Sequence, residues 1–110
     1  MPPRTSIGEF EQMVLLAILR LKKEAFAPAV GQLLEEAGRR RVSRGALYAT
    51  LDRLEEKGYL RWDLAGATPE RGGNRRRRFE VTPAGVATLR ATRSALMTLW
   101  QGLDEVLAER

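Results

Sequence analysis

Histidine and cysteine are both absent from the 110 residues of this chain. Without them the chain cannot build the usual structural zinc sites, thiol chemistry, or Ser/His or Cys/His catalysis. The remaining carboxylate pairs fall on helix faces that the sequence pattern leaves solvated, with no glycine-rich or metal-spaced context around them. The composition therefore argues against an enzyme, and neither a cofactor nor a metal is expected.

Long apolar stretches are missing as well. The longest, residues 13–19, has seven residues, whereas a helix that spans a bilayer needs about 20. No apolar signal segment occurs in residues 1–10. Hydrophobic residues make up 44% of the chain, enough for one small folded domain. We therefore expect a soluble protein of the cytoplasm with no membrane partner.

Arginine is concentrated in two short stretches from which acidic residues are missing. Residues 39–44 hold four arginines and residues 71–78 hold five, which gives these 14 positions a charge of +9. The other 96 residues carry ten basic and fourteen acidic side chains, a net charge of −4. Basicity that is this local favours a polyanionic partner over a general contribution to solubility.

Residues 42–58, VSRGALYATLDRLEEKG, form the segment around which the rest of the chain is organised. Ser43 is typical of a helix N-cap, and Gly58 of the position just after a helix end. Three leucines recur on one face, which is expected to pack on a core. The exposed N-terminal part is small and basic, and this favours a DNA recognition helix because helix N-termini attract anions. An ordinary amphipathic helix with a solvated outer face is the alternative.

Two helices are predicted ahead of this segment. The first begins at a capping pattern, SIGE at residues 6–9, and ends at Lys22. Its apolar arc is too wide for one small core, so we expect a second surface to cover part of it. The second helix begins at Pro28, which suits a first helical position, and ends at Gly38. Together with residues 42–58 it forms a helix-turn-helix arrangement.

The pattern changes to a period of two after Gly58. Leu60, Trp62 and Leu64 alternate with polar residues, which predicts a strand with these three side chains on its core-facing side. Residues 78–82 alternate again, and turn-forming glycine, proline and asparagine lie between the two runs. These features predict a β-hairpin with a long, arginine-rich tip, the wing of a winged helix-turn-helix.

The last predicted helix begins at Thr82 and Pro83 and runs nearly to the C-terminus. Its apolar residues form a heptad seam, interrupted by Arg93, along about 26 residues or roughly 39 Å. Such a helix would project beyond the domain, so we expect a two-fold dimer, with folding back as a monomer as the alternative. The expected fold is mainly α with a small β-hairpin. We assign residues 1–82 to a winged helix-turn-helix DNA-binding domain and residues 83–110 to a C-terminal dimerisation helix.

Three segments, FEQMVLLAILRL, VSRGALYATLDRLEEKGYL and ERGGNRRRRFEVTPAG, strongly resemble the PadR family of bacterial transcriptional regulators. The resemblance covers about residues 8–90. The short tail, with one helix after the wing, is similar to the compact branch of the family. The resemblance implies a winged-helix dimer that binds operator DNA, usually as a repressor, with dimer contacts from the C-terminal helix.

Carried over by position, the resemblance implies a set of DNA contacts. These are Ser43, Arg44, Gly45, Ala46 and Tyr48 on the recognition helix and Arg75, Arg76 and Arg77 on the wing. Arg75 and Arg76, nearest the tip, are the expected phosphate or minor-groove contacts. Arg78 is expected to pack along the hairpin. The alternatives are that Tyr48 packs on the wing and that Arg44 is solvated.

The C-terminal seam also contains a candidate ligand site. The residues assigned to dimer contacts or to this site are Met13, Leu16, Leu89, Leu96, Met97, Trp100, Leu103 and Leu107. Trp100 opposite its symmetry mate would form a slot for a flat aromatic effector, and the alternative is that Trp100 is simply dimer core.

The sequence as a whole predicts a sequence-specific DNA-binding regulator. We expect a repressor that binds a palindromic operator in double-stranded DNA as a homodimer, is nucleoid-associated when bound, and is released by a small-molecule ligand. The alternative is a winged-helix module that binds proteins without specific DNA binding. Acidic clusters in place of the arginine-rich wing would favour that alternative, and the wing sequence lacks them.

Overall fold

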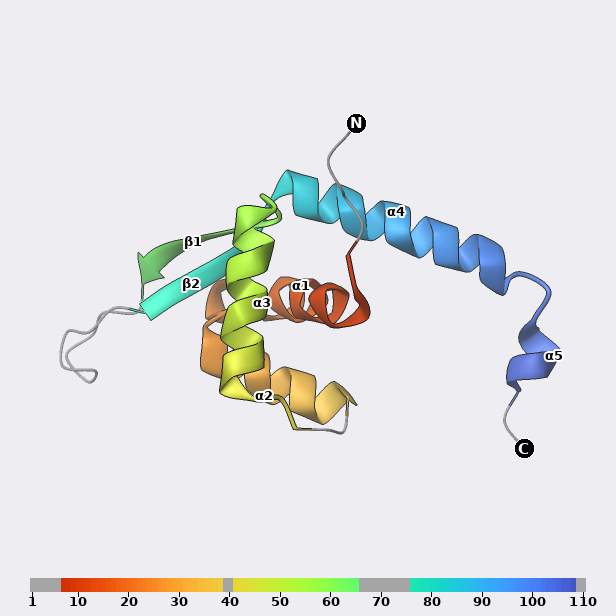
Figure 1. Cartoon of the computed structure of the whole chain (residues 1–110), viewed down its shortest axis with the longest axis horizontal. Coiled ribbons are helices and arrows are strands. Elements are labelled where there is room, and N and C mark those ends of the chain that lie inside the picture. The colour runs from red at the N-terminus through yellow and green to blue at the C-terminus, as the bar shows by residue number, and fades with distance from the viewer. Residues whose placement is uncertain (1–6, 39–40, 66–75, 109–110) are drawn as a thin grey trace.

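The computed structural model of this chain describes residues 7–38, 41–65 and 76–108. Ser6, Arg75 and most of the arginine-rich tip lie outside the described residues. The fold is mainly helical, with one two-stranded antiparallel sheet (Figure 1). The elements are α1 (Glu9–Leu21), a short 3-10 helix η1 (Lys22–Glu24), α2 (Ala27–Gly38), α3 (Arg44–Glu56), β1 (Leu60–Ala65), β2 (Arg76–Val81), α4 (Pro83–Trp100) and α5 (Asp104–Leu107). This order confirms the predicted helix-turn-helix followed by a wing.

One apolar core forms where α1, α2 and α3 meet the base of the hairpin. In Figure 1, α3 crosses in front of α1, the hairpin projects to one side and α4 leads away on the other. The buried apolar side chains include Val14, Leu15, Ile18, Val30, Leu34, Leu47, Leu51, Leu54, Tyr59, Leu60, Phe79, Val81 and Leu89. Burial of a large aliphatic side chain contributes about 1.5–3 kcal/mol relative to exposure. The core therefore holds one face of α3 firmly and leaves its other faces accessible.

The starts of the first two helices differ from the prediction. α1 has Gly8 as its N-cap, and the Gly8 backbone N–H donates a hydrogen bond to Glu11 Oε1 at 2.9 Å. The Glu11 carboxylate thus supplies the capping bond two residues later than Glu9 would in the pattern that begins at Ser6. α2 begins at Ala27, so Pro28 takes the second helical position, where its missing N–H also costs no helical hydrogen bond.

Both predicted ends of α3 are confirmed. The Ser43 hydroxyl caps its start, and Gly58 follows its end with a φ of 82°. The Gly58 N–H donates to the Glu55 carbonyl and the Tyr59 N–H to the Leu54 carbonyl, both at 2.9 Å. This pair of bonds requires a left-handed residue, which glycine supplies without steric cost. The chain therefore turns directly from α3 into β1.

The hairpin pairs β1 with β2, and Trp62 lies opposite Phe79. An isolated antiparallel bridge from Phe26 to Arg78 ties the segment before α2 to β2. Phe79 is buried, but Trp62 and Leu64 are 38% and 52% exposed. The sequence predicted a shared core-facing side for Leu60, Trp62 and Leu64, and burial along it decreases from Leu60, which is 2% exposed, to Leu64. Strand alternation sets the face of a side chain, but the outer half of the hairpin extends past the helices that would cover it (Figure 1).

The C-terminal segment is two helices, where the sequence predicted one long helix. The start is as predicted, because the Gly85 N–H donates to the Thr82 hydroxyl at 3.1 Å. However, α4 ends at Trp100, and Gly102 has a φ of 80°, a left-handed conformation that breaks the helix before α5. α4 is thus about 27 Å long, at 1.5 Å per residue. The glycine within the heptad pattern is the sequence signal for this break.

Candidate nucleic-acid interface

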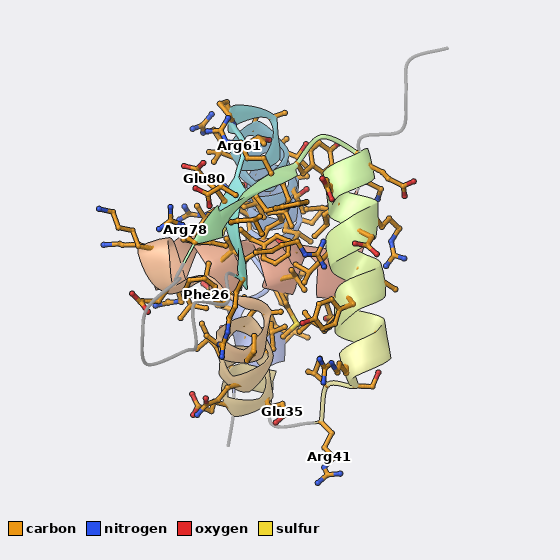
Figure 2. The ribbon with its side chains drawn as sticks, turned by 90° about the vertical axis from the view of Figure 1, so that its left-hand side faces the viewer. Phe26, Glu35, Arg41, Arg61, Arg78 and Glu80 are labelled. Atoms are coloured by element: carbon orange, nitrogen blue, oxygen red, sulfur yellow. The ribbon has the colours of Figure 1, made fainter. Side chains whose placement is uncertain are left out.

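The start of α3 is held by two hydrogen bonds. The Ala46 N–H donates to Ser43 Oγ at 3.0 Å, and the Val42 N–H donates to Glu35 Oε2 at 3.0 Å. The second bond ties the turn before α3 to α2. Arg41, in the same turn, extends away from the protein below this end of α3 (Figure 2). The helix N-terminus is therefore fixed in place with a cation beside it, as an anion-binding surface requires.

The first two turns of α3 expose small side chains. Gly45, Ala46 and Ala49 are all exposed, and a Cβ added at Gly45 would meet no atom within 4 Å. A surface of this kind can approach base edges closely in a major groove. Further along α3 the exposed residues include the acidic Asp52 and Glu56. The small side chains and Arg44 thus lie together on the N-terminal half of α3, while the acidic residues lie on its C-terminal half.

An open groove of about 490 Å³ separates α3 from the wing. It is lined by Phe26, Ala27, Pro28, Arg44, Tyr48, Leu64, Arg76, Arg77 and Phe79. The guanidinium carbons of Arg44 and Arg77 lie 5.7 and 5.9 Å from the centroid of the Tyr48 ring. Tyr48 does pack against the wing, through Arg77, and contact of its hydroxyl with DNA stays a prediction.

The wing arginines have different surroundings. Arg76 is exposed at the outer end of β2, whereas Arg77 is only 32% exposed. Arg78 pairs with Asp63, Nη2 to Oδ2, at 3.0 Å, which confirms that it packs along the hairpin. Arg61 pairs with Glu80 at 2.8 Å on the same side, which is turned away from α3 (Figure 2). The two ion pairs thus neutralise this outer side of the hairpin, and Arg76, which pairs with no acidic side chain among the described residues, lies at its end.

A buried carboxylate joins α1 to α3. Glu11, whose side chain is 8% exposed, accepts hydrogen bonds from Arg53 Nε at 3.0 Å and from Lys57 Nζ at 2.8 Å. Burial by itself would raise the pKa of Glu11, but the hydrogen bonds from Lys57, the Gly8 backbone and Arg53 outweigh burial and hold the pKa below 4.5.

We expect Glu11→Gln to lower the free energy of unfolding near pH 7 by about 1–2 kcal/mol, because hydrogen bonds to a charged group are worth about 1.5–3 kcal/mol and solvent screens part of this cluster. Since the folded pKa of Glu11 is lowered, this stabilisation is present above 4.5 and is lost as the pH falls through the folded value. Urea unfolding near pH 7 and near pH 3 should show the difference between the two proteins shrinking at the lower pH. Glu36→Gln, at an exposed position on α2, is the control. An equal loss at both pH values would rule out a contribution from the Glu11 charge.

The residues predicted for dimer contacts or a ligand lie in two settings. Leu16, Leu96, Met97, Trp100, Leu103 and Leu107 are exposed, each by more than 40%. Met13 is partly buried against the core of its own chain. Leu89 is 8% exposed and belongs to that core, so its assignment to the dimer seam is corrected. The cause is that the first turns of α4 pack on the hairpin base before the helix leaves the domain.

Residues 15–91 match the family described as "Transcriptional regulator PadR-like family". The matched range is more than half of the chain and contains α2, α3 and both strands of the wing. The chain belongs to the PadR-like family. The resemblance drawn from three sequence segments is thus confirmed, and this PadR-like protein is a DNA-binding transcriptional regulator.

Solved structures of PadR proteins share this fold. A PadR-like transcription factor from Bacteroides fragilis is 28% identical over 88% of each chain, with a TM-score of 0.69. A PadR family regulator from Eggerthella lenta DSM 2243 is 24% identical over 90% of this chain and 87% of its own, with a TM-score of 0.61. One from Clostridium difficile R20291 is 18% identical over 90% and 99%, with a TM-score of 0.67. The last two support the fold alone. No curated protein matches the sequence.

The described part of this PadR-like chain has neither a membrane-spanning helix nor a cluster of metal ligands. Across residues 7–38, 41–65 and 76–108, no helix has both the length and the apolar character needed to cross a membrane. Over the same residues, no three potential ligands from acidic side chains gather closely enough to hold a metal ion.

Proposed function

We propose that this PadR-like protein regulates transcription by binding a specific operator in double-stranded DNA. The observation that carries the proposal is the small, exposed face of α3 with positive charge on both sides of it. A major groove can accept this face closely, while the flanking arginines neutralise the phosphates along its edges. The proposed DNA contacts are Ser43, Arg44, Gly45, Ala46 and Tyr48 on α3 and Arg75 and Arg76 on the wing.

The proposed contacts have separate roles. Arg44 takes either a phosphate or the O6 and N7 edge of a guanine, and the Tyr48 hydroxyl reaches a phosphate or a base edge. Arg75 and Arg76 bind phosphates or enter the minor groove beside the recognition helix. Because phosphate contacts position a protein without reading sequence, the wing contributes affinity, and α3 supplies the specificity.

We also propose a homodimer in which residues 1–82 bind DNA and residues 83–110 join the two copies. The support is apolar exposure on two elements, with Leu16 and Leu19 on α1 and Leu96 and Trp100 on α4. A second copy would cover both surfaces by two-fold symmetry. The two α3 helices would then bind half-sites about 34–36 Å apart, so the operator would be palindromic.

Footprinting on the DNA upstream of the gene tests the operator. Two protected half-sites of inverted sequence, one helical turn apart, are the expected result. A single protected half-site would contradict the dimeric arrangement. The absence of any protected site there would show that this upstream DNA contains no operator.

Leu96→Glu should convert the dimer to a monomer and lower operator affinity by at least about a hundredfold, because each half-site then binds alone. Leu96 is exposed and outside the core of its own chain, so the monomer should stay folded. Thr98→Glu, on the opposite side of the same exposed helix, is the matched control and should remain dimeric. Light scattering measures the oligomeric state of both variants, and circular dichroism shows whether they remain folded. A Leu96→Glu protein that is still dimeric would exclude α4 as the dimer contact.

Repression and release by a ligand complete the proposal, with the protein acting in the cytoplasm at the nucleoid. Disrupting the gene should raise expression from its operator promoter, whereas lower expression would indicate an activator.

Trp100 with its symmetry mate would hold a flat aromatic effector. In a Trp62→Phe protein, Trp100 is the one remaining tryptophan, and planar aromatic compounds in excess should quench it. Unchanged fluorescence would leave Trp100 as plain dimer core.

A further inference from the structure

One side of α3 faces the wing. Tyr48, Asp52 and Glu55 lie at spacings of four and three along α3, so they form a single stripe on this side. The stripe is polar and aromatic, unlike the leucine stripe that packs on the core. Each of its three residues has a partner in the hairpin.

Arg77 of β2 meets two residues of this stripe. Its guanidinium carbon lies 5.9 Å from the centroid of the Tyr48 ring, and its Nη1 is 3.8 Å from Asp52 Oδ1. The same guanidinium lies 5.3 Å from the ring centroid of Trp62 and 5.4 Å from that of Phe79. A cation held among three rings gains attraction from each of them, and more as water is excluded. The charge of Arg77 is thus engaged by Asp52 and three aromatic rings of its own chain.

Trp62 of β1 meets the third residue of the stripe. Its indole Nε1–H donates a hydrogen bond to Glu55 Oε2 at 3.0 Å. The Trp62 ring also lies against the Arg77 guanidinium, so the two contacts are joined. Both strands of the hairpin are therefore attached to α3, β1 through Trp62 and β2 through Arg77.

We infer that Tyr48, Asp52, Glu55, Trp62 and Arg77 form a wing–helix contact that sets the angle of the wing relative to the recognition helix. This inference rests on the proposed function and refines it. Arg77 is then a positioning residue, which acts through the placement of α3 and the wing, and the neighbouring Arg76 carries the phosphate contact. Two-stranded hairpins are only marginally stable alone, so the angle of this one depends on its contacts with the rest of the domain, and this contact is the one that joins both strands to α3.

Fixing the angle matters for DNA binding. A regulator that reaches the major groove with a helix and the adjacent backbone with a wing must present both at once. If the wing were loose, ordering it on the DNA would oppose association. The wing–helix contact removes that cost before binding. Loss of the contact should therefore weaken binding without removing any bond between protein and phosphate.

The salt dependence of operator affinity separates a positioning residue from a phosphate contact. Each phosphate contact contributes about 0.9 to the slope of log K against log salt. We expect Arg77→Met to weaken operator binding by about tenfold, with the wild-type slope retained. Arg76→Met is the matched control, and it should make the salt dependence shallower, with the magnitude of the slope smaller by about 0.9. Fluorescence anisotropy over a salt series measures both proteins on the operator duplex.

The outcomes distinguish this inference from the proposed function. If the wild-type protein fails to bind specific DNA, the proposed function fails and the wing–helix contact has no operator to serve. If the wild type binds and Arg77→Met lowers the slope by about 0.9, Arg77 contacts phosphate and only the inference is overturned. Unchanged affinity in Arg77→Met would overturn it equally.

A second pair of variants tests the same contact at an exposed residue, where folding is not at risk. Glu55→Gln and Glu55→Ala both remove the negative charge, but only glutamine keeps an acceptor for the Trp62 N–H. We expect Glu55→Ala to bind the operator about threefold more weakly than Glu55→Gln. The same pair at Glu56, which is exposed next to it, should show no such difference. Equal affinity of the two Glu55 variants would contradict the inference.

Discussion

Gly45→Glu is expected to reduce operator affinity by at least about a hundredfold, since a like charge at an interface costs several kcal/mol. The substitution adds bulk and a negative charge to the small face of α3 that is proposed to enter the major groove. The fold should tolerate it, because nothing lies within 4 Å of a Cβ at this position. Glutamate also suits the first turn of a helix. Anisotropy on the operator duplex and thermal unfolding measure the two effects.

Gly45→Ala is the matched control for that experiment. It adds only a methyl group and should stabilise α3 by about 0.5–1 kcal/mol, because alanine is the better helix former. Its operator affinity should stay much closer to the wild-type value than that of Gly45→Glu. Retained affinity in the glutamate variant would mean that DNA does not meet this face of α3.

Gly85→Ala should destabilise the protein by about 1–3 kcal/mol, the usual cost of overpacking. A Cβ at Gly85 would lie 2.5 Å from the Tyr59 carbonyl oxygen and 2.7 Å from a methyl carbon of Val81. The carbonyl is backbone and accepts a hydrogen bond from the Thr82 N–H at 3.0 Å, so it cannot move aside freely. α4 would have to lift from the turn between α3 and β1.

The effect of Gly85→Ala is measured by thermal and urea unfolding, with Gly45→Ala as the matched glycine-to-alanine change in open space. One variant should lose stability and the other gain it. An unfolding free energy for Gly85→Ala equal to that of the wild type would show that α4 does not approach the hairpin base this closely.

Features set by neighbouring residues could be predicted from the sequence. The Ser43 cap, the Gly58 reversal and the Thr82 cap each depend on a few adjacent positions, and the structure confirms all three. The length of the last helix was wrong because the heptad pattern was given more weight than Gly102. A glycine in a helix interior costs about 1 kcal/mol, and the exposed residues around it supply no core packing within the chain to offset that cost.

Contacts between distant elements could not be predicted in the same way. Glu11 lies on the same side of α1 as Val14, Leu15 and Ile18, and an acidic residue within an apolar stripe signals a buried partner. The sequence does not say that this partner is the Arg53 and Lys57 pair 42 and 46 positions away. Pairing across that distance depends on how α1 and α3 pack.

The wing arginines show how far alternation alone can go. It places Arg77 on the same face as Phe79, and that parity was the available signal that Arg77 points toward the body of the protein. Alternation does not predict that Arg77 contacts Tyr48 and Asp52 of α3. The proposal that Arg77 positions the wing while Arg76 contacts DNA therefore rests on the position of α3 relative to the hairpin.

The central claim is specific DNA binding, and fluorescence anisotropy on the duplex upstream of the gene, against a shuffled duplex across a salt series, tests it most directly. We predict tight binding to the upstream duplex over the control, with affinity that falls steeply as salt rises. Equal, salt-sensitive binding to both duplexes would mean that the operator lies elsewhere. No binding to either duplex at low salt would contradict the account and favour a module that binds proteins.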